Sequence, residues 1–362
     1  SIYHLRYHSV HNSGPLLMGK IPLIQPAELH LPWRDNQALK TTVPAAARGF
    51  GRGMIMPNLT PTVTNVNRAS DYRERILDQR PEGSDWQPLM VLYLTDNTSP
   101  DDIIAAANSG FIYGCKYYPA GATTNSDSGV TNLNNMDAVF ETMQEVGMVL
   151  QMHGEVTTPD IDIFDREAVF IERHLRPLVA KFPRLKMVME HITTKQGAEF
   201  VLSAGDNVAA SITPQHLLHN RNDMLVGGIR PHFFGFPTLK RDIHQQALIR
   251  VATSGSHKVF LGTDSAPHAQ GDKESACGCA GIFSATNTMS CLAEVFERAG
   301  ALDKLEGFTS LFGPKFYGLA PNADHITLTK GAEVEFPSYI STGAGPVTVF
   351  NPGIDLHWMV TD

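Results

Sequence analysis

The feature that most constrains the fold of this chain is a repeated alternation between short apolar runs and longer segments of helical period. The runs are nearly continuous instead of alternating with polar residues, which is typical of strands buried on both faces of a parallel sheet. Counting the short run that ends at His30, we expect eight strands. The other seven are predicted at 51–59, 89–95, 114–120, 148–155, 186–192, 208–216 and 258–266.

The segments between these runs carry the pattern of helices that bury one face. Between residues 134 and 147 an apolar stripe is followed by Gly147, a residue well suited to end a helix. The stripe consists of Met136, Val139, Phe140, Met143 and Val146. Similar patterns cover 165–182, 193–205, 238–255 and 284–302.

Eight strands that alternate with helices over roughly 250 residues predict an α/β fold, a (β/α)8 barrel of the TIM type. A doubly wound open sheet is the alternative, but that fold favours a glycine-rich phosphate loop after the first strand, and none follows His30. No linker or repeat divides the sequence. We therefore expect one barrel domain with a C-terminal extension at 26–362, preceded by an N-terminal tail at 1–25.

Composition excludes several classes of partner. The chain has 362 residues, of which 42% are hydrophobic, and a net charge of −8, with no dominant cluster of Lys or Arg. We therefore expect neither nucleic acid nor an anionic membrane as a partner, and no apolar run approaches the ~18 residues of a membrane span. The first residues lack the apolar core of a secretion signal, and four cysteines are too few for a disulfide framework. These features predict a cytoplasmic protein, or a plastid one if the source is a plant.

Several predicted strands end in a residue that can bind a metal or transfer a proton. These residues are His30, Lys116, His153, His191 and Asp264. The carboxyl ends of all strands meet on one face of such a barrel, so residues far apart in sequence converge there. One histidine at a strand end is usually structural, but five such residues at five strand ends predict a metal site. Imidazole nitrogens and carboxylate oxygens suit zinc and similar divalent ions.

Lys116 does not fit this set in its ordinary state, because an ammonium group repels a cation. Carbamylation by CO₂ would convert the amine into an anion whose two oxygens can bridge two metals. The alternative is a lysine that pairs with an acid or extends its amine to solvent. The spacing of the residues leaves both interpretations open.

Seven ordered motifs give the sequence a close resemblance to the dihydroorotase family of amidohydrolases, in its single-function bacterial and plant branch. They are MPNL (56–59), KYYPAGATTNS (116–126), HGEVT (153–157), EHITT (190–194), ITPQHLLHNRN (212–222), LGTDSAPH (261–268) and CGCAG (277–281). The resemblance extends from about residue 28 to about residue 320.

The resemblance implies two Zn²⁺ ions per subunit on the barrel. His153 and His191 would hold one ion, His30 and Asp264 would hold the other, and carbamylated Lys116 would bridge both. The family's substrate-binding positions fall on Arg34, Asn58, His268, Ala280 and Phe236, and the loop that closes over substrate carries Thr123 and Thr124. The family also implies a homodimer.

The implied reaction is the reversible hydrolysis of L-dihydroorotate to N-carbamoyl-L-aspartate in pyrimidine (UMP) biosynthesis, with Asp264 transferring the proton. A related cyclic amidase, such as a hydantoinase or allantoinase, is the alternative enzyme. Arg34, Asn58 and His268 discriminate between the two, because they predict a requirement for a free carboxylate on the substrate.

One position departs from the family pattern His-x-His-x-Arg-Asp. His30, Arg34 and Asp35 align with it, but Pro32 stands where the second histidine belongs, and proline has no ligand atom. Three explanations are open: an imperfect reading of the sequence, an active enzyme with an altered first metal site, or a catalytically silent barrel that supports a partner enzyme.

Overall fold

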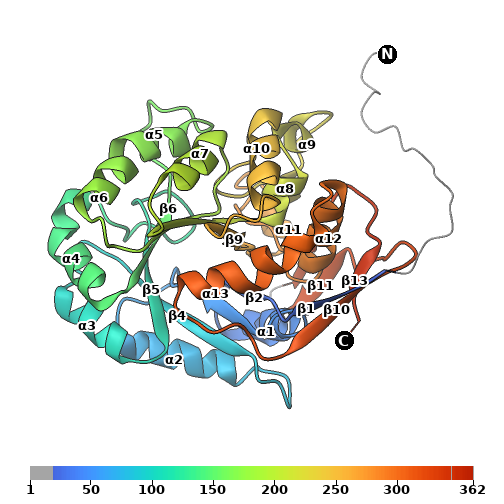
Figure 1. Cartoon of the computed structure of the whole chain (residues 1–362), viewed down its shortest axis with the longest axis horizontal. Coiled ribbons are helices and arrows are strands. Elements are labelled where there is room, and N and C mark those ends of the chain that lie inside the picture. The colour runs from blue at the N-terminus through green and yellow to red at the C-terminus, as the bar shows by residue number, and fades with distance from the viewer. Residues whose placement is uncertain (1–18, 344, 362) are drawn as a thin grey trace.

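Eight parallel strands form the centre of the molecule, and their order in the sheet is their order in the chain. The structure is a computed structural model that describes residues 19–343 and 345–361. Figure 1 shows the strands surrounded by helices, which confirms the predicted (β/α)8 barrel. The barrel strands are β2 (Ala27–Leu31), β3 (Arg52–Ile55), β4 (Gln87–Tyr93), β5 (Ile112–Tyr117), β6 (Val149–His153), β7 (Met187–Glu190), β8 (Val208–Ile212) and β9 (Val259–Leu261).

The helices follow the strands as the sequence pattern predicts. The helix expected between 134 and 147 is formed by η2 (Leu133–Met136) and α4 (Asp137–Val146), and Gly147 ends it with a φ of 74°. Val139, Phe140 and Met143 are buried as expected, whereas Val146 is 40% exposed because it lies in the last turn. The first helices are η1 (Asn36–Ala38), α1 (Leu39–Ala47), α2 (Val66–Leu77), α3 (Pro100–Asn108), η2 (Leu133–Met136) and α4 (Asp137–Val146).

The remaining helices cover the second half of the barrel. The segment expected to be helical at 165–182 is continuous, but a π-helical turn lies at its centre. The elements are α5 (Arg166–Phe170), η3 (Ile171–Leu175), α6 (Arg176–Lys181), α7 (Lys195–Ser203), α8 (Pro214–Leu218), α9 (Arg221–Leu225), η4 (Pro231–Phe233), α10 (Asp242–Ala252), α11 (Gln270–Lys273), α12 (Thr288–Arg298), η5 (Leu302–Lys304), η6 (Gly307–Leu311) and α13 (Phe312–Phe316). Within the described residues, no helix is long and apolar enough to cross a membrane.

Alternation along the strands separates the interior of the barrel from the layer beneath the helices. In β6, Val149 belongs to an apolar cluster drawn from several strands, whereas Leu150 and Met152 pack in the outer core. Gln151 shares the inner side, where its side-chain amide donates to the Tyr317 hydroxyl at 2.9 Å. Because side chains alternate between the two faces, His153 at the end of β6 also faces the interior.

The barrel closes at a seam between β2 and β9, which lie side by side without a hydrogen-bonded ladder in the described part of the chain. Glu28, fully buried in β2, bridges the seam with its carboxylate. It accepts hydrogen bonds from the backbone N–H groups of Thr263 and His30. The Asp264 N–H donates to the His30 carbonyl at 3.0 Å. The seam therefore sets the relative positions of two predicted metal ligands.

A small antiparallel sheet lies beside the barrel and joins the two ends of the described chain (Figure 1). It contains β1 (Lys20–Ile24), β10 (His325–Lys330) and β13 (Trp358–Val360), and β11 (Tyr339–Thr342) pairs separately with β12 (Gly345–Thr348). We assigned residues 1–25 to a tail, but 20–24 form β1 in this sheet. Residues 1–18 lie outside the described residues, and the division of the chain at residue 25 stays a prediction.

We predict that Glu28→Leu lowers the free energy of unfolding by about 3 kcal/mol, because it leaves two buried N–H groups without an acceptor. Urea unfolding measures the change. Glu28→Gln keeps an acceptor oxygen for one of the two N–H groups and should lose less stability than the leucine variant. A leucine variant as stable as the parent would contradict this role for the carboxylate.

Candidate metal centre and substrate pocket

The residues predicted to form the site converge on one pocket at the carboxyl ends of the strands. The pocket has an empty volume of about 380 Å³. It is lined by His30, Pro32, Arg34, Asn58, Lys116, Tyr118, Thr123, Thr124, His153, His191, Phe236, Asp264, Ala266, Ala280 and Gly281. Of the predicted site residues, only His268 lies outside this lining. It lines an adjoining cavity that shares Ala266 and Gly281 with the pocket.

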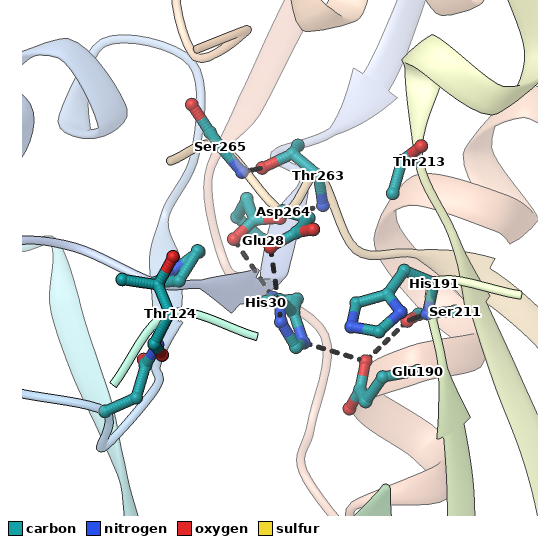
Figure 2. Close-up of polar contacts among 12 residues, drawn as sticks. Glu28, His30, Thr124, Glu190, His191, Ser211, Thr213, Thr263, Asp264 and Ser265 are labelled. Carbon is teal, nitrogen blue, oxygen red and sulfur yellow. Dashed lines mark hydrogen bonds and ion pairs between the residues drawn. The ribbon is translucent and has the colours of Figure 1, made fainter. Parts of the chain in front are cut away.

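The three histidines and Asp264 lie next to one another at the base of the pocket. The His191 ring packs edge-on against His30 and His153, with centroid separations of 4.8 and 5.0 Å. The Nε2 atom of His30 lies 3.6 Å from an Asp264 carboxylate oxygen. Figure 2 shows His30 between Asp264 on one side and Glu190 on the other. Residues from β2, β6 and from just after β7 and β9 thus form one cluster.

Two of these residues adopt a left-handed backbone conformation that side chains other than glycine rarely take. The φ angle is 39° at His191 and 51° at Asp264, and each residue comes just after a barrel strand. Hydrogen bonds hold both: the His191 N–H donates to the Ser211 hydroxyl at 2.8 Å, and the Asp264 N–H donates to the His30 carbonyl. Such strained positions cluster at functional sites, because the surrounding structure must keep them in place.

Lys116 is the most unusual group in the pocket. Its side chain is fully buried, and its Nζ atom has no hydrogen-bond partner among the described residues. The Tyr118 ring centroid lies 5.1 Å from Nζ. Burial lowers the pKa of Lys116 below its ordinary value, although the Glu190 and Asp264 carboxylates oppose the shift. A buried ammonium without partners is costly, so this position favours a neutral or modified amine.

Burial also keeps the histidines neutral at pH 7, which is the form that binds metals. It lowers the pKa of His30 to about 4, lowers that of His153, and places that of His191 well below its usual range. In each case the nearby Lys116 cation acts in the same direction. Nδ1 of His191 is buried without a hydrogen-bond partner in the described structure. This free imidazole nitrogen and the free Lys116 amine fit a metal centre.

Two glutamates contact the outer nitrogens of the other histidines. An Oε2 atom of Glu190 lies 3.0 Å from Nδ1 of His30, and Glu155 lies 2.7 Å from Nε2 of His153. The Ser211 hydroxyl donates to Glu190 in turn. Carboxylates in this position orient an imidazole and fix its tautomer, leaving the second nitrogen free for a ligand.

We did not predict Glu28, Glu155 and Glu190 from the sequence. Each is a charged residue inside or directly beside an apolar strand run, and all three are buried. That combination was the available signal, because a buried carboxylate needs a partner.

His216, by contrast, is of a residue type that binds metals, but it has another role. It follows β8 and is buried, but its ring nitrogens contact the Thr213 hydroxyl and the Pro237 carbonyl, which is a structural role.

Another part of the pocket wall presents groups suited to a carboxylate. An Nη2 atom of Arg34 lies 3.3 Å from Nε2 of His268. Burial lowers the pKa of His268 to about 4, so the ring is neutral and accepts from the guanidinium. Asn58 lies beside them and donates to the Thr124 carbonyl at 3.1 Å, which ties the 123–124 loop to the pocket wall. A guanidinium beside neutral donors is an arrangement that binds carboxylates.

Comparison with known proteins places this geometry in a family. A model of the amidohydrolase family matches residues 28–333. The chain is 56% identical over 342 residues to the dihydroorotase of Stutzerimonas stutzeri, a match that covers 94% of this chain and 98% of the relative. The chain belongs to the amidohydrolase family and, within it, to the dihydroorotases. Dihydroorotases are metal-dependent enzymes that hydrolyse a cyclic amide bond, and this amidohydrolase is one of them.

Solved structures agree with the assignment. Dihydroorotase from Campylobacter jejuni has a TM-score of 0.87 at 34% identity, covering 95% of this chain and 98% of that one. Dihydroorotase from Saccharomyces cerevisiae, in complex with 5-fluoroorotic acid, has the same TM-score at 32% identity and covers 94% and 98%. L-hydantoinase from Arthrobacter aurescens, at 16% identity and a TM-score of 0.74, shares only the fold. The alternative of a hydantoinase-like enzyme is therefore not favoured.

The predicted metal ligands of this amidohydrolase come in pairs. No group of three His, Cys, Asp or Glu side chains in the described part of the chain forms a metal site on its own. His153 and His191 make one pair, and His30 and Asp264 make the other. Pro32 lines the pocket two residues after His30 but offers no ligand atom. If these pairs hold metals, each would need Lys116 as a third ligand, which an unmodified ammonium cannot supply.

We predict that Lys116→Met stabilises the metal-free protein by about 1–3 kcal/mol, because it replaces an unpartnered buried amine with an apolar group of similar length. Urea unfolding after treatment with a chelator measures the change. Lys186→Met is the matched control, since that amine donates to the Phe316 carbonyl and its loss should destabilise the fold. Equal destabilisation by both substitutions would refute the interpretation of Lys116.

Proposed function

We propose that this amidohydrolase catalyses the reversible hydrolysis of L-dihydroorotate to N-carbamoyl-L-aspartate, the dihydroorotase step of pyrimidine biosynthesis. The observation that carries the proposal is one pocket whose wall has two complementary parts. One part of the wall holds three neutral histidines, Asp264 and an unpartnered lysine, and the other holds Arg34 and Asn58, with His268 contacting Arg34 from the adjoining cavity. The first part suits metal-dependent hydrolysis, and the second suits the free carboxylate of the substrate.

Two Zn²⁺ ions fit the ligand pairs. His153 and His191 would hold one ion, and His30 and Asp264 would hold the other. Lys116 would bridge them as a carbamate, which forms when the neutral amine adds to CO₂ and releases a proton. The buried Nζ atom without a partner supports this modification, because the carbamate removes the buried positive charge. When bound, the metals supply a Lewis acid for the ring carbonyl and lower the pKa of water.

Asp264 is the residue that moves the proton. Its carboxylate faces the pocket next to His30, and burial raises its pKa although the Lys116 charge opposes the shift. A carboxylate with a raised pKa can hold a proton near neutral pH. Asp264 would accept the proton of the attacking water at Oδ1 or Oδ2 and donate it to the leaving ring nitrogen. In the cyclisation direction, the same carboxylate would remove the proton from the carbamoyl nitrogen.

The carboxylate wall would orient the ring so that its amide carbonyl faces the ligand pairs. The bound 5-fluoroorotic acid of the Saccharomyces cerevisiae relative is a ring carboxylate, which fits such a wall. Arg34 would donate to the carboxylate, with Asn58 and His268 beside it. Fixing both ends of the substrate converts attack on the carbonyl into a reaction between positioned groups.

Three further pocket elements would complete the site. Thr123 and Thr124 lie on a loop that contacts Asn58, so they can close over the substrate from the solvent side. Phe236 and Ala280 face the pocket from neighbouring loops and would contact the ring. We expect a homodimer in the cytoplasm, and both properties stay predictions that the described residues do not test.

We predict that protein supplied with zinc and bicarbonate consumes dihydroorotate at alkaline pH and forms it from carbamoyl aspartate at lower pH. Absorbance of the ring follows both directions.

We predict that Arg34→Met raises KM for dihydroorotate about 100-fold while zinc content stays unchanged, because a charged contact to the carboxylate is lost. Arg52→Met is the control. It removes a half-buried guanidinium at the amino-terminal end of β3, the end away from the pocket, where Arg52 donates to the Asn322 side chain. Turnover of an amide analogue at the rate of the acid would exclude the proposed substrate.

We predict that Pro32→His strengthens binding of the more weakly held zinc ion at least about tenfold, since it adds an imidazole beside His30 in the pocket wall. Zinc titration monitored by calorimetry and by metal analysis checks this. Pro32→Ala is the control, because it removes the ring of proline without adding a ligand. Identical zinc affinities for the histidine and alanine variants would show that position 32 does not face the ion held by His30 and Asp264. A parent protein that binds no zinc at all would favour the silent barrel.

A further inference from the structure

Lys273, at the end of α11, is a buried lysine that lies outside the metal ligands. Its side chain is only 4% exposed. Its ammonium group has three N–H donors and lies within hydrogen-bond distance of four backbone carbonyls: those of Cys279 and Gly281 at 2.7 Å, Phe234 at 2.9 Å and, sharing a hydrogen, Gly278 at 3.4 Å. In the described part of the chain it forms no ion pair with a carboxylate. The charge therefore serves to hold carbonyls together.

These carbonyls belong to two loops that form one wall of the substrate pocket. Phe236 comes from the first loop, and Ala280 and Gly281 come from the second. The Gly281 N–H also donates to the Phe234 carbonyl at 3.0 Å. The second loop has an unusual backbone, with a φ of 21° at Cys279 and 72° at Gly278. Carbonyl oxygens that point at a common centre repel one another, so this conformation requires the ammonium.

The same loop touches the carboxylate-binding histidine. A side-chain carbon added to Gly281 would lie 2.6 Å from Cδ2 of His268, so the loop and the imidazole are in close contact. His268 in turn contacts Arg34. A continuous chain of contacts thus leads from the Lys273 amine to the guanidinium.

We propose that Lys273 is a positioning residue for the substrate carboxylate, acting by fixing the 278–281 loop against His268 and Arg34. The inference rests on the proposed function and adds a residue to it. The alternative is that Lys273 only stabilises the fold. The two differ in what its removal changes: a positioning role alters binding of a ring carboxylate in protein that remains folded and metal-loaded.

The test measures the affinity of zinc-loaded protein for 5-fluoroorotic acid by calorimetry, together with zinc content and the melting temperature. Lys273→Met removes the ammonium and keeps the length of the side chain. We expect its Kd to rise at least about tenfold, with zinc content unchanged. In turnover assays, KM for dihydroorotate should rise more than kcat falls.

Lys258→Met is the matched control. Lys258, which precedes β9, is also a buried lysine, and its amine donates to the Ala204 carbonyl. That variant should lose stability without a change in Kd.

Chemical rescue separates positioning from general stability. Lys273→Ala leaves space for the missing part of the side chain next to a cavity lined by His268 and Gly281. Added n-propylammonium should restore binding of 5-fluoroorotic acid at least threefold, whereas 1-propanol, which has no charge, should not.

Each result supports or contradicts the proposed role of Lys273. Binding by Lys273→Met equal to that of the parent overturns the role of Lys273 and leaves the proposed function intact. A parent protein that does not bind 5-fluoroorotic acid contradicts the proposed function and the inference together. If the Lys273 variants do not fold, Gly281→Ala tests the same wall with the lysine in place. It must weaken binding by displacing His268, and unchanged binding would refute the proposal.

Discussion

The seam between β2 and β9 is the constraint on which both the barrel and its pocket depend. A ladder of backbone hydrogen bonds joins the other neighbouring strands, but here a buried carboxylate, Glu28, holds the two edges together. The seam ends at His30 and Asp264, so the same contacts that close the barrel bring two predicted ligands of one metal within 3.6 Å. Closure and ligand placement therefore have a common origin.

Burial of charged groups in the pocket costs folding free energy that a bound metal would offset. Burial disfavours the Lys116 cation and also raises the pKa of Asp264, so each group is held away from its preferred state in water. Left-handed φ angles at His191 and Asp264 add strain to the backbone. Bound cations and a carbamate would compensate all of these costs at once. Stability is sacrificed where function requires it, which is common in active sites.

Much of the fold followed from local pattern. The strands end where polar residues interrupt apolar runs, and the carboxyl ends of parallel strands share one face, so the sequence alone was enough to predict that His30, Lys116 and His153 lie together. The small sheet was missed because β1 and β10 pair across some 300 residues, for which the sequence holds no local signal. Lys273 was missed for a different reason, since its partners are backbone carbonyls that leave no trace in the sequence. Glu28, Glu155 and Glu190 carried a signal, that of charge in a buried strand, but not the identity of their partners.

Pro32 lies in the pocket lining at the position where the family pattern has a histidine. The backbone position is therefore kept, but the side chain offers no ligand atom. The Arg34 guanidinium still donates to the Pro32 carbonyl at 3.2 Å, and Trp33 beside it is fully buried and stacks on Trp86. The backbone that would present a ligand at position 32 is thus intact, and only the side chain is inert. One metal would keep His153, His191 and Lys116, whereas the other would keep only His30, Asp264 and the shared Lys116. If both metals bind, this ligand set would make them unequal, and the weaker one would lie beside Asp264, the residue proposed to transfer the proton.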